Sequence, residues 1–340
     1  MNKAKFVLSK SKVIEQYNKV KKISDIISYS SKTNQDVTKI LEKETDSMFS
    51  VHRTNELKHI QDKSRVIFLA QAWTYEYIKQ FTEMGITNFV VDNEPDLNEL
   101  LKYLELNDLK INLSLRLKLK ENTMRTEKYF VFGMNSNIIN KKLKELRNNK
   151  KIKKLGIHFH RKTQNMSEWN LKYELTNIID DWKNIDQVNI GGGIPSVYAN
   201  TNEDVIKTVF KKIEEFKKFL EEKNIQLTIE PGRFIAASPV KLVTYIKSIY
   251  DNNIIVNASV YNTDMDALIV PVKLLVEKEL EKGTPYVIKG YTPCSLDLFR
   301  YKVYLNNPKV GDKLVFLNAG AYNFTTDFCD LEKLETGIIE

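Results

Sequence analysis

Short β-rich runs alternate with longer helical patterns along the first two thirds of the chain, and this alternation limits the folds open to it. The clearest helical pattern places apolar residues three or four positions apart, at Val205, Val209, Ile213 and Phe216. The β-rich runs lie at residues 26–29, 66–70, 88–91, 111–117, 155–159, 187–190 and 227–230. Strands that alternate with helices run parallel to one another, so the sequence predicts a parallel α/β fold.

Seven units of one strand and one helix in so short a stretch are too many for most open sheets. They are close to the eight such units of a (β/α) barrel. We expect the eighth strand near residues 240–246. In a barrel, the loops that follow the strands form the active-site face. Lys32, His160, Gly191–Gly193 and Glu230–Arg233 each come directly after a predicted strand. A barrel would therefore gather them at one mouth.

The pattern changes after about residue 240, where β-rich runs are separated by turn residues and no long helical pattern intervenes. Such a pattern is typical of an antiparallel sheet. We therefore expect a barrel domain over residues 9–240 and a β domain over residues 241–340. An N-terminal strand within residues 1–8 is expected to join the β domain.

The composition excludes several classes of protein. No apolar run reaches the roughly 18 to 20 residues that span a bilayer, and the N-terminus lacks the apolar core of a signal peptide, so we expect a cytoplasmic protein without a membrane partner. Two cysteines are too few for a disulfide framework, and none of the four histidines has zinc-ligand spacing, so we expect no metal. The net charge of +8 comes from lysines spread over many helical patterns, so we expect no nucleic-acid partner.

Lys32 stands at the point where the run ending at Tyr29 gives way to a helical pattern. A lysine at the end of a buried strand can lose hydration and act as a neutral amine, which forms an imine with an aldehyde. A solvated turn residue is the plainer interpretation of Lys32 alone. The choice between these two interpretations depends on the residues that end the other strands.

Three of those strand ends carry chemically informative residues. Gly191–Gly193 would free backbone N–H groups for a phosphate, or form only a tight turn, and Arg233 could add a two-pronged contact to the same phosphate. Glu230 is costly to bury without a cationic partner, which could be Arg233 or a pyridinium nitrogen. His160 is either an ordinary core histidine or a flat ring stacked on a cofactor. Together with Lys32, these residues indicate a site for pyridoxal 5′-phosphate.

The motifs that carry these residues occur in a familiar order. They are Tyr-x-x-Lys-x-Asn at 29–34, His-Phe-His at 158–160, Gly-Gly-Gly-Ile-Pro at 191–195, Glu-Pro-Gly-Arg-Phe at 230–234 and Gly-Ala-Tyr at 320–322. Over nearly its whole length the chain resembles the fold-type III decarboxylases of basic amino acids, which include ornithine, diaminopimelate, arginine and carboxynorspermidine enzymes. The resemblance implies an alanine-racemase-like (β/α)8 barrel with a C-terminal antiparallel β domain, and a pyridoxal-phosphate-dependent carboxy-lyase.

By this resemblance, Lys32 binds the cofactor covalently, His160 stacks on its ring and Glu230 keeps its nitrogen protonated. The other implied cofactor contacts are Arg116, Thr163, Gly191, Gly192, Gly193, Gly232, Arg233 and Tyr322. The resemblance also implies a homodimer, in which a cysteine loop from one subunit completes the site of the other. Cys294 in that loop would protonate the α-carbon.

The chain departs from the family in two loops. Where the family has small residues after its histidine, this chain has Arg161, Lys162 and Thr163. In the cysteine loop, Pro293 occupies the cysteine position when the segments are aligned on Asp297, so Cys294 serves only if the loop is one residue shorter. Otherwise the acid would be Ser295, Tyr291 or water.

These departures bear on the substrate. Ser295 follows Cys294 where the family has an acid that receives a distal amine, and the nearest acid is Asp297, while Arg161 could meet an anion. We therefore expect a bulky phosphate-bearing substrate, with a 3-amino-3-carboxypropyl group as in the biosynthesis of microcin C-like antibiotics. The alternative is a free basic amino acid of a polyamine or lysine pathway: ornithine, lysine, diaminopimelate, arginine or carboxynorspermidine.

Two other interpretations of the function stay open. A racemase of the same fold would use a tyrosine as its second base, whereas this chain has the cysteine loop. A non-catalytic carrier of pyridoxal phosphate would be a single barrel without a β domain. The sequence leaves open whether the chain is a whole protein or one domain of a longer one.

Overall fold

The computed structural model describes residues 2–119, 132–322 and 326–340. Its residues form two compact units. The barrel unit comprises Tyr17–Ile194 and Asp204–Gly232, and the sheet unit comprises Met1–Gln16, Pro195–Glu203 and Arg233–Glu340. The domain boundary expected at residue 240 stays a prediction.

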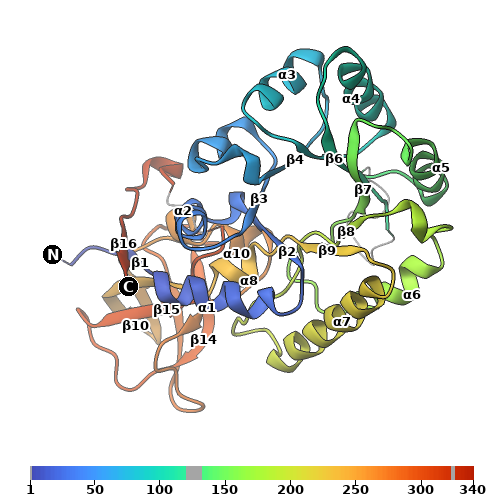
Figure 1. The fold of residues 1–340 in the computed structure, drawn as a ribbon. Coiled ribbons are helices and arrows are strands. Elements are labelled where there is room, and N and C mark those ends of the chain that lie inside the picture. The colour runs from blue at the N-terminus through green and yellow to red at the C-terminus, as the bar shows by residue number, and fades with distance from the viewer. Residues whose placement is uncertain (1, 120–131, 323–325) are drawn as a thin grey trace. The chain divides into compact units, whose positions relative to one another are not determined.

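Eight parallel strands close the barrel in sequence order, and helices lie outside the ring of strands (Figure 1). The strands are β2 (Ile26–Ser30), β3 (Met48–Val51), β4 (Val66–Ala70), β5 (Asn88–Val91), β6 (Ile111–Arg116), β7 (Ile152–His158), β8 (Gln187–Asn189) and β9 (Gln226–Ile229). The helices are α2 (Gln35–Glu44), α3 (Tyr75–Glu83), α4 (Glu94–Leu106), α5 (Ser136–Leu146), α6 (Leu171–Thr176) and α7 (Glu203–Glu221), and α1 (Lys10–Lys21) leads along the chain into the barrel. The predicted barrel is confirmed.

The expected position of the eighth strand is wrong. The missing strand is β3, whereas residues 240–246 belong to β10 of the sheet unit. The run that forms β3 has only four residues, one of which is the polar Ser50, and its apolar Met48 and Val51 continue the helical spacing of Val37 and Leu41 in α2. Ser50 is nevertheless buried, because its hydroxyl lies 2.7 Å from the hydroxyl of Ser28 on the neighbouring strand.

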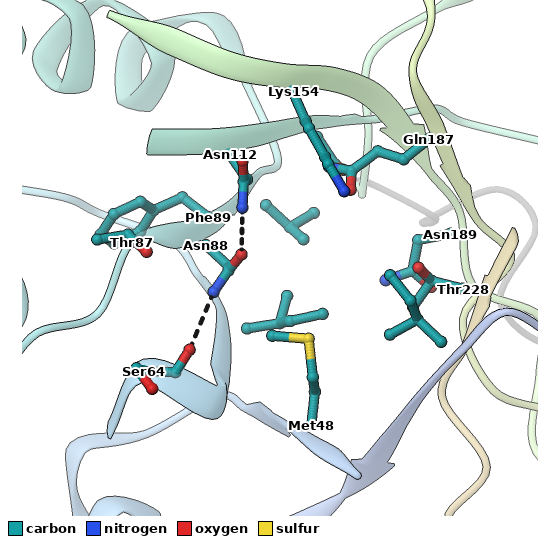
Figure 2. A pocket seen from close by; sticks show the side chains of 14 residues that line it. Met48, Ser64, Thr87, Asn88, Phe89, Asn112, Lys154, Gln187, Asn189 and Thr228 are labelled. Atoms are coloured by element: carbon teal, nitrogen blue, oxygen red, sulfur yellow. Dashed lines mark hydrogen bonds between the residues drawn. The ribbon is translucent and has the colours of Figure 1, made fainter. Parts of the chain in front are cut away.

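Polar and apolar side chains together line the lower interior of the barrel, where they enclose a cavity of about 280 Å³ (Figure 2). Asn112 donates to Asn88 at 2.8 Å, and Asn88 donates to the backbone carbonyl of Ser64 at 3.4 Å. Asn88 opens β5, so the cavity lies at the end where the strands begin. The side chain of Asn189, which lines this cavity, also extends toward the opposite end of the barrel.

Capping side chains begin several of the outer helices. Asn34 accepts the backbone N–H groups of Asp36 and Val37 at the start of α2, and Asn93 accepts that of Asp96 at the start of α4. Such side chains satisfy N–H groups that the first helical turn leaves unpaired. The caps therefore fix where each helix starts after its strand.

The sheet unit is a largely antiparallel sheet of eight strands, which confirms the predicted β domain. Its elements are β1 (Lys5–Ser9), α8 (Arg233–Ala236), β10 (Val240–Tyr250), β11 (Asn253–Val256), α9 (Val260–Thr263), α10 (Asp266–Ile269), β12 (Leu275–Val276), β13 (Pro285–Lys289), β14 (Leu298–Tyr304), β15 (Lys313–Leu317) and β16 (Thr336–Ile339). β1 pairs antiparallel with β10, as expected for the N-terminal strand. The pairs β11–β13 and β1–β16 are parallel. Within the described residues, none of the helices is both long and apolar enough to cross a membrane.

Candidate active site

The alternation of side chains along the strands directs three charged or titratable residues into the upper end of the barrel. Ser114, Lys154 and Thr228 line the lower cavity. Arg116, His158 and Glu230 follow them by two or four positions, so these residues face the same interior. They lie at the ends of β6, β7 and β9, where a barrel carries its site.

Lys32 lies two residues beyond the end of β2, in a short 3₁₀ turn over Ser31–Thr33. Its side chain is exposed, while Ser31 and Thr33 on either side are buried. A Cβ atom at Gly232 would lie only 2.2 Å from the Thr33 hydroxyl, so glycine is needed where the loop after β9 packs on this turn. The predicted contact of Gly232 with a cofactor stays a prediction.

Glu230 is a buried carboxylate held by two donors. Asn189 Nδ2 donates to Oε1 at 2.9 Å, and His158 Nε2 lies 3.3 Å from Oε2. Burial by itself would raise the pKa of the Glu230 carboxyl, but His158 and His160 together outweigh it and hold this pKa well below its usual range. Burial lowers the pKa of the His158 imidazole, so we assign a neutral ring that donates its Nε2–H to the carboxylate.

The environment of His160 defines its tautomer. The backbone N–H of Gly192 donates to His160 Nδ1 at 3.2 Å, so this nitrogen carries no proton. The same nitrogen lies 3.9 Å from Glu230, beyond hydrogen-bond range. His158, His160 and Glu230 are close enough together to suggest a metal site, but the Gly192 N–H already uses the His160 lone pair. The site therefore offers a neutral, partly exposed ring beside a buried carboxylate.

The glycine loop is built for close packing. Gly191 and Gly193 have positive φ angles of 64° and 96°, and a Cβ at Gly191 would lie 2.4 Å from the Phe159 carbonyl oxygen. The expectation that all three N–H groups are free is wrong for two of them. The Gly191 N–H donates to the side chain of Asn189, and the Gly192 N–H donates to that of His160.

Arg116 and Arg161, two predicted site residues, both have acidic partners. Arg116 donates to Asp92 at 2.9 Å and keeps one face over the ring of Phe132. Arg161 is 1% exposed and donates to Glu174 at 2.5 Å, so its charge is already compensated inside the barrel unit. Thr163 lies half-buried in the loop that follows. This geometry removes the argument for Arg161 as a partner of an anionic substrate.

Within the sheet unit, Arg233 is surrounded by groups that the sequence analysis did not single out. Its guanidinium is buried, forms a two-pronged pair with Asp266 at 2.5 and 3.1 Å, and donates to the Tyr198 hydroxyl at 3.0 Å. It also lies over the ring of Tyr322, 5.3 Å from the ring centroid. Arg233 and Tyr322 thus lie together, and Asp266 holds the arginine in place, while their predicted contact with a phosphate stays a prediction.

The cysteine loop places its residues unequally. Asp297 is fully buried and accepts the backbone N–H groups of Val260 and Thr292 at 2.8 and 3.0 Å. Its carboxylate therefore ties the loop to the sheet unit, whereas Ser295 is exposed. Cys294 is half-buried, with its sulfur 2.7 Å from the hydroxyl of Tyr261. That hydrogen bond lowers the pKa of the Cys294 thiol.

Replacing Tyr261 by phenylalanine should slow alkylation of Cys294 severalfold near neutral pH. The hydrogen bond lowers the thiol pKa, so its loss raises the pKa and reduces the thiolate fraction, which is the nucleophile. The measurement is the iodoacetamide rate against pH in a Cys329→Ser background. Tyr291→Phe, in the same loop, is the matched control and should leave the profile unchanged. A profile for Tyr261→Phe that superimposes on that of the control would contradict the role of this hydroxyl.

The site residues that sequence analysis missed fall into two groups. His158 and Asn189 precede recognised motif residues by two positions, so strand alternation could have indicated that they share the same interior. No pattern in the sequence marks the other group, Asp92, Tyr198 and Asp266. They become apparent only in the structure, through their contacts with Arg116 and Arg233.

Comparisons with known proteins agree with this geometry. Residues 10–237 match the family described as "Pyridoxal-dependent decarboxylase, pyridoxal binding domain". An ornithine decarboxylase from Caenorhabditis elegans is 26% identical over 194 residues, which are 54% of this chain and 43% of that protein. The match thus spans less than half the length of that curated relative.

Solved structures share the fold. A lysine/ornithine decarboxylase from Vibrio vulnificus in complex with cadaverine has a TM-score of 0.78 at 20% identity, over 99% of this chain and 94% of that one. An arginine decarboxylase from Paramecium bursaria Chlorella virus has a TM-score of 0.79 at 21% identity, over 100% and 96%. A diaminopimelate decarboxylase from Helicobacter pylori, with L-lysine bound, reaches 0.80 at 18% identity, over 100% and 92%. At these identities the likeness concerns the fold alone.

Proposed function

Because the chain belongs to the family of pyridoxal-dependent decarboxylases, we propose that it releases the α-carboxylate of a free amino acid as CO₂, with pyridoxal 5′-phosphate as its cofactor. The observation that carries this proposal is the buried, ionised Glu230, which lies at the same end of the barrel as the strand-end Lys32. A buried carboxylate with two donors is suited to a cationic ring nitrogen.

The barrel residues fit the cofactor on their own chemistry. The bound cofactor supplies an electron sink for the pair left behind by CO₂. Lys32 would hold it through its amine, and Glu230 would keep a proton on its ring nitrogen. The neutral ring of His160 can lie against a flat ring without adding a charge that opposes that proton. Cys294 as the acid that protonates the α-carbon stays a prediction, as does the homodimer.

For the substrate we propose a free amino acid with a second amine. The idea of a phosphate-bearing, microcin-like substrate gains no support from the comparisons, and Arg161 is already paired with Glu174. The curated relative is named an ornithine decarboxylase, and the structural neighbours are named for lysine, ornithine, arginine and diaminopimelate. These names favour a distal amine or guanidinium without choosing among the candidates.

The test measures CO₂ release from ornithine, lysine, arginine, diaminopimelate and carboxynorspermidine. We expect kcat/KM on the order of 10⁴ M⁻¹s⁻¹ or better for at least one of them. The same sample should show an absorbance band near the visible edge that borohydride removes. CO₂ release confined to a phosphate-bearing amino acid would contradict the proposed substrate class. A bound cofactor without any CO₂ release would instead indicate a carrier.

A further inference from the structure

His52 occupies the end of β3, the strand that the sequence did not reveal. β2 and β3 pair in parallel with Ser30 opposite Ser50. Two residues further along each segment stand Lys32 and His52. The two side chains therefore come from adjacent strands at the same mouth of the barrel.

The imidazole of His52 faces a carboxylate across a gap. Its Nδ1 atom is buried and, within the described residues, has no hydrogen-bond partner. The nearest acid is Glu56, whose Oε2 atom lies 4.0 Å away and is likewise buried and unpartnered. The other carboxylate oxygen of Glu56 accepts the backbone N–H of His52 at 3.2 Å, which fixes the acid in place. Buried polar atoms normally have partners, so two that face each other need an explanation.

The charges around His52 keep the ring neutral at neutral pH. Burial is the largest influence and lowers the imidazole pKa, and the Lys32 ammonium lowers it further. Glu56 and Glu230 act in the opposite direction without reversing the shift. The ring is thus unprotonated beside an ammonium group, and a carboxylate stands ready to stabilise it once it becomes charged.

We propose that His52, supported by Glu56, is the base that accepts the proton from the Lys32 ammonium. The proton would move from Lys32 Nζ to the imidazole, and the freed lone pair of Nζ would bond to the aldehyde carbon of the cofactor. The aldehyde oxygen would leave as water, with one further proton from Nζ and the proton that the imidazolium returns. Glu56 stabilises the imidazolium by closing on Nδ1–H, as the acid of a histidine–carboxylate pair does. This inference rests on the proposed attachment of the cofactor to Lys32.

The experiment measures how fast the cofactor-free protein captures pyridoxal phosphate, followed by absorbance and by mass spectrometry after borohydride. Removing a positioned base should slow the capture by His52→Gln about 100-fold at neutral pH. Final occupancy should stay near that of the unchanged protein. Glu56→Gln should show a smaller loss. His59→Gln, which removes the nearest other histidine along the chain, is the matched control and should keep the original rate.

Chemical rescue separates a base from a structural residue. In His52→Ala, added imidazole should restore most of the capture rate, because it can enter the space that the ring leaves and accept the proton. A structural role would lower occupancy and would not respond to imidazole. A rate for His52→Gln equal to that of His59→Gln, or a His52→Ala rate indifferent to imidazole, overturns the proposal. Failure of the unchanged protein to label Lys32 would overturn the cofactor attachment itself, and this inference with it.

Discussion

Lys32→Ala should abolish covalent capture of pyridoxal phosphate and lower turnover by about 10³-fold or more, since the amine that forms the covalent bond is gone. Lys32 lies just beyond a strand of the barrel, on a turn whose neighbours are buried, so the substitution removes an exposed chain without opening a cavity. The measurements are CO₂ release and the mass of the Lys32 peptide after borohydride. Thermal unfolding should be nearly unchanged.

Lys39→Ala is the matched control for this variant. Lys39 is an exposed lysine on α2, in the helix that follows the turn, and it forms a surface ion pair with Asp36. We expect normal cofactor capture and turnover from it. If Lys32→Ala retained a borohydride-stable label at another lysine together with normal turnover, Lys32 would not be the attachment residue.

Most of the barrel could be predicted because its strands are apolar runs bounded by turn residues. β4 and β5 were predicted with the bounds that the structure gives them. β3 escaped because its apolar residues Met48 and Val51 continue the helical spacing of Val37 and Leu41 in α2, so the run did not stand out as a separate strand. The same omission hid His52, which becomes visible only once β3 is placed beside β2.

The candidate site was predictable only where chemistry coincided with a strand end. Lys32 and Glu230 could be predicted because an unpaired charge at the end of a buried strand is costly unless it has a function. The partners of the arginines could not be predicted, since Asp266 and Asp92 are brought to Arg233 and Arg116 by tertiary packing. Arg161 shows the reverse failure. Its position after His160 suggested an exposed cation, and the fold instead buried it against Glu174.

Glu230→Gln should cost both activity and stability. Loss of the carboxylate removes the partner proposed for the ring nitrogen, and we expect turnover to fall by roughly 10²- to 10³-fold. The amide also has one oxygen for two donors, His158 Nε2–H and Asn189 Nδ2–H, so one of these buried donors then faces an N–H₂ group. Leaving that buried donor unpaired should lower the free energy of unfolding by about 1–3 kcal/mol.

The pH dependence of unfolding provides an independent check of the Glu230–His158 pair. The pKa of the Glu230 carboxyl is lowered in the folded protein, so its contribution to stability is present above the unfolded value near 4.5 and is lost as the pH falls. The pKa of His158 is also lowered, so the benefit of its neutral buried ring begins to decline once the pH drops below about 6.5. Both groups therefore destabilise the fold on acidification, His158 first. In Glu230→Gln the loss of stability below about pH 4.5 should shrink, while the loss from His158 should remain.

The matched control is Glu214→Gln on the exposed face of α7. A Glu230→Gln protein with the turnover and acid unfolding of this control would show that the buried carboxylate serves neither the cofactor nor the fold.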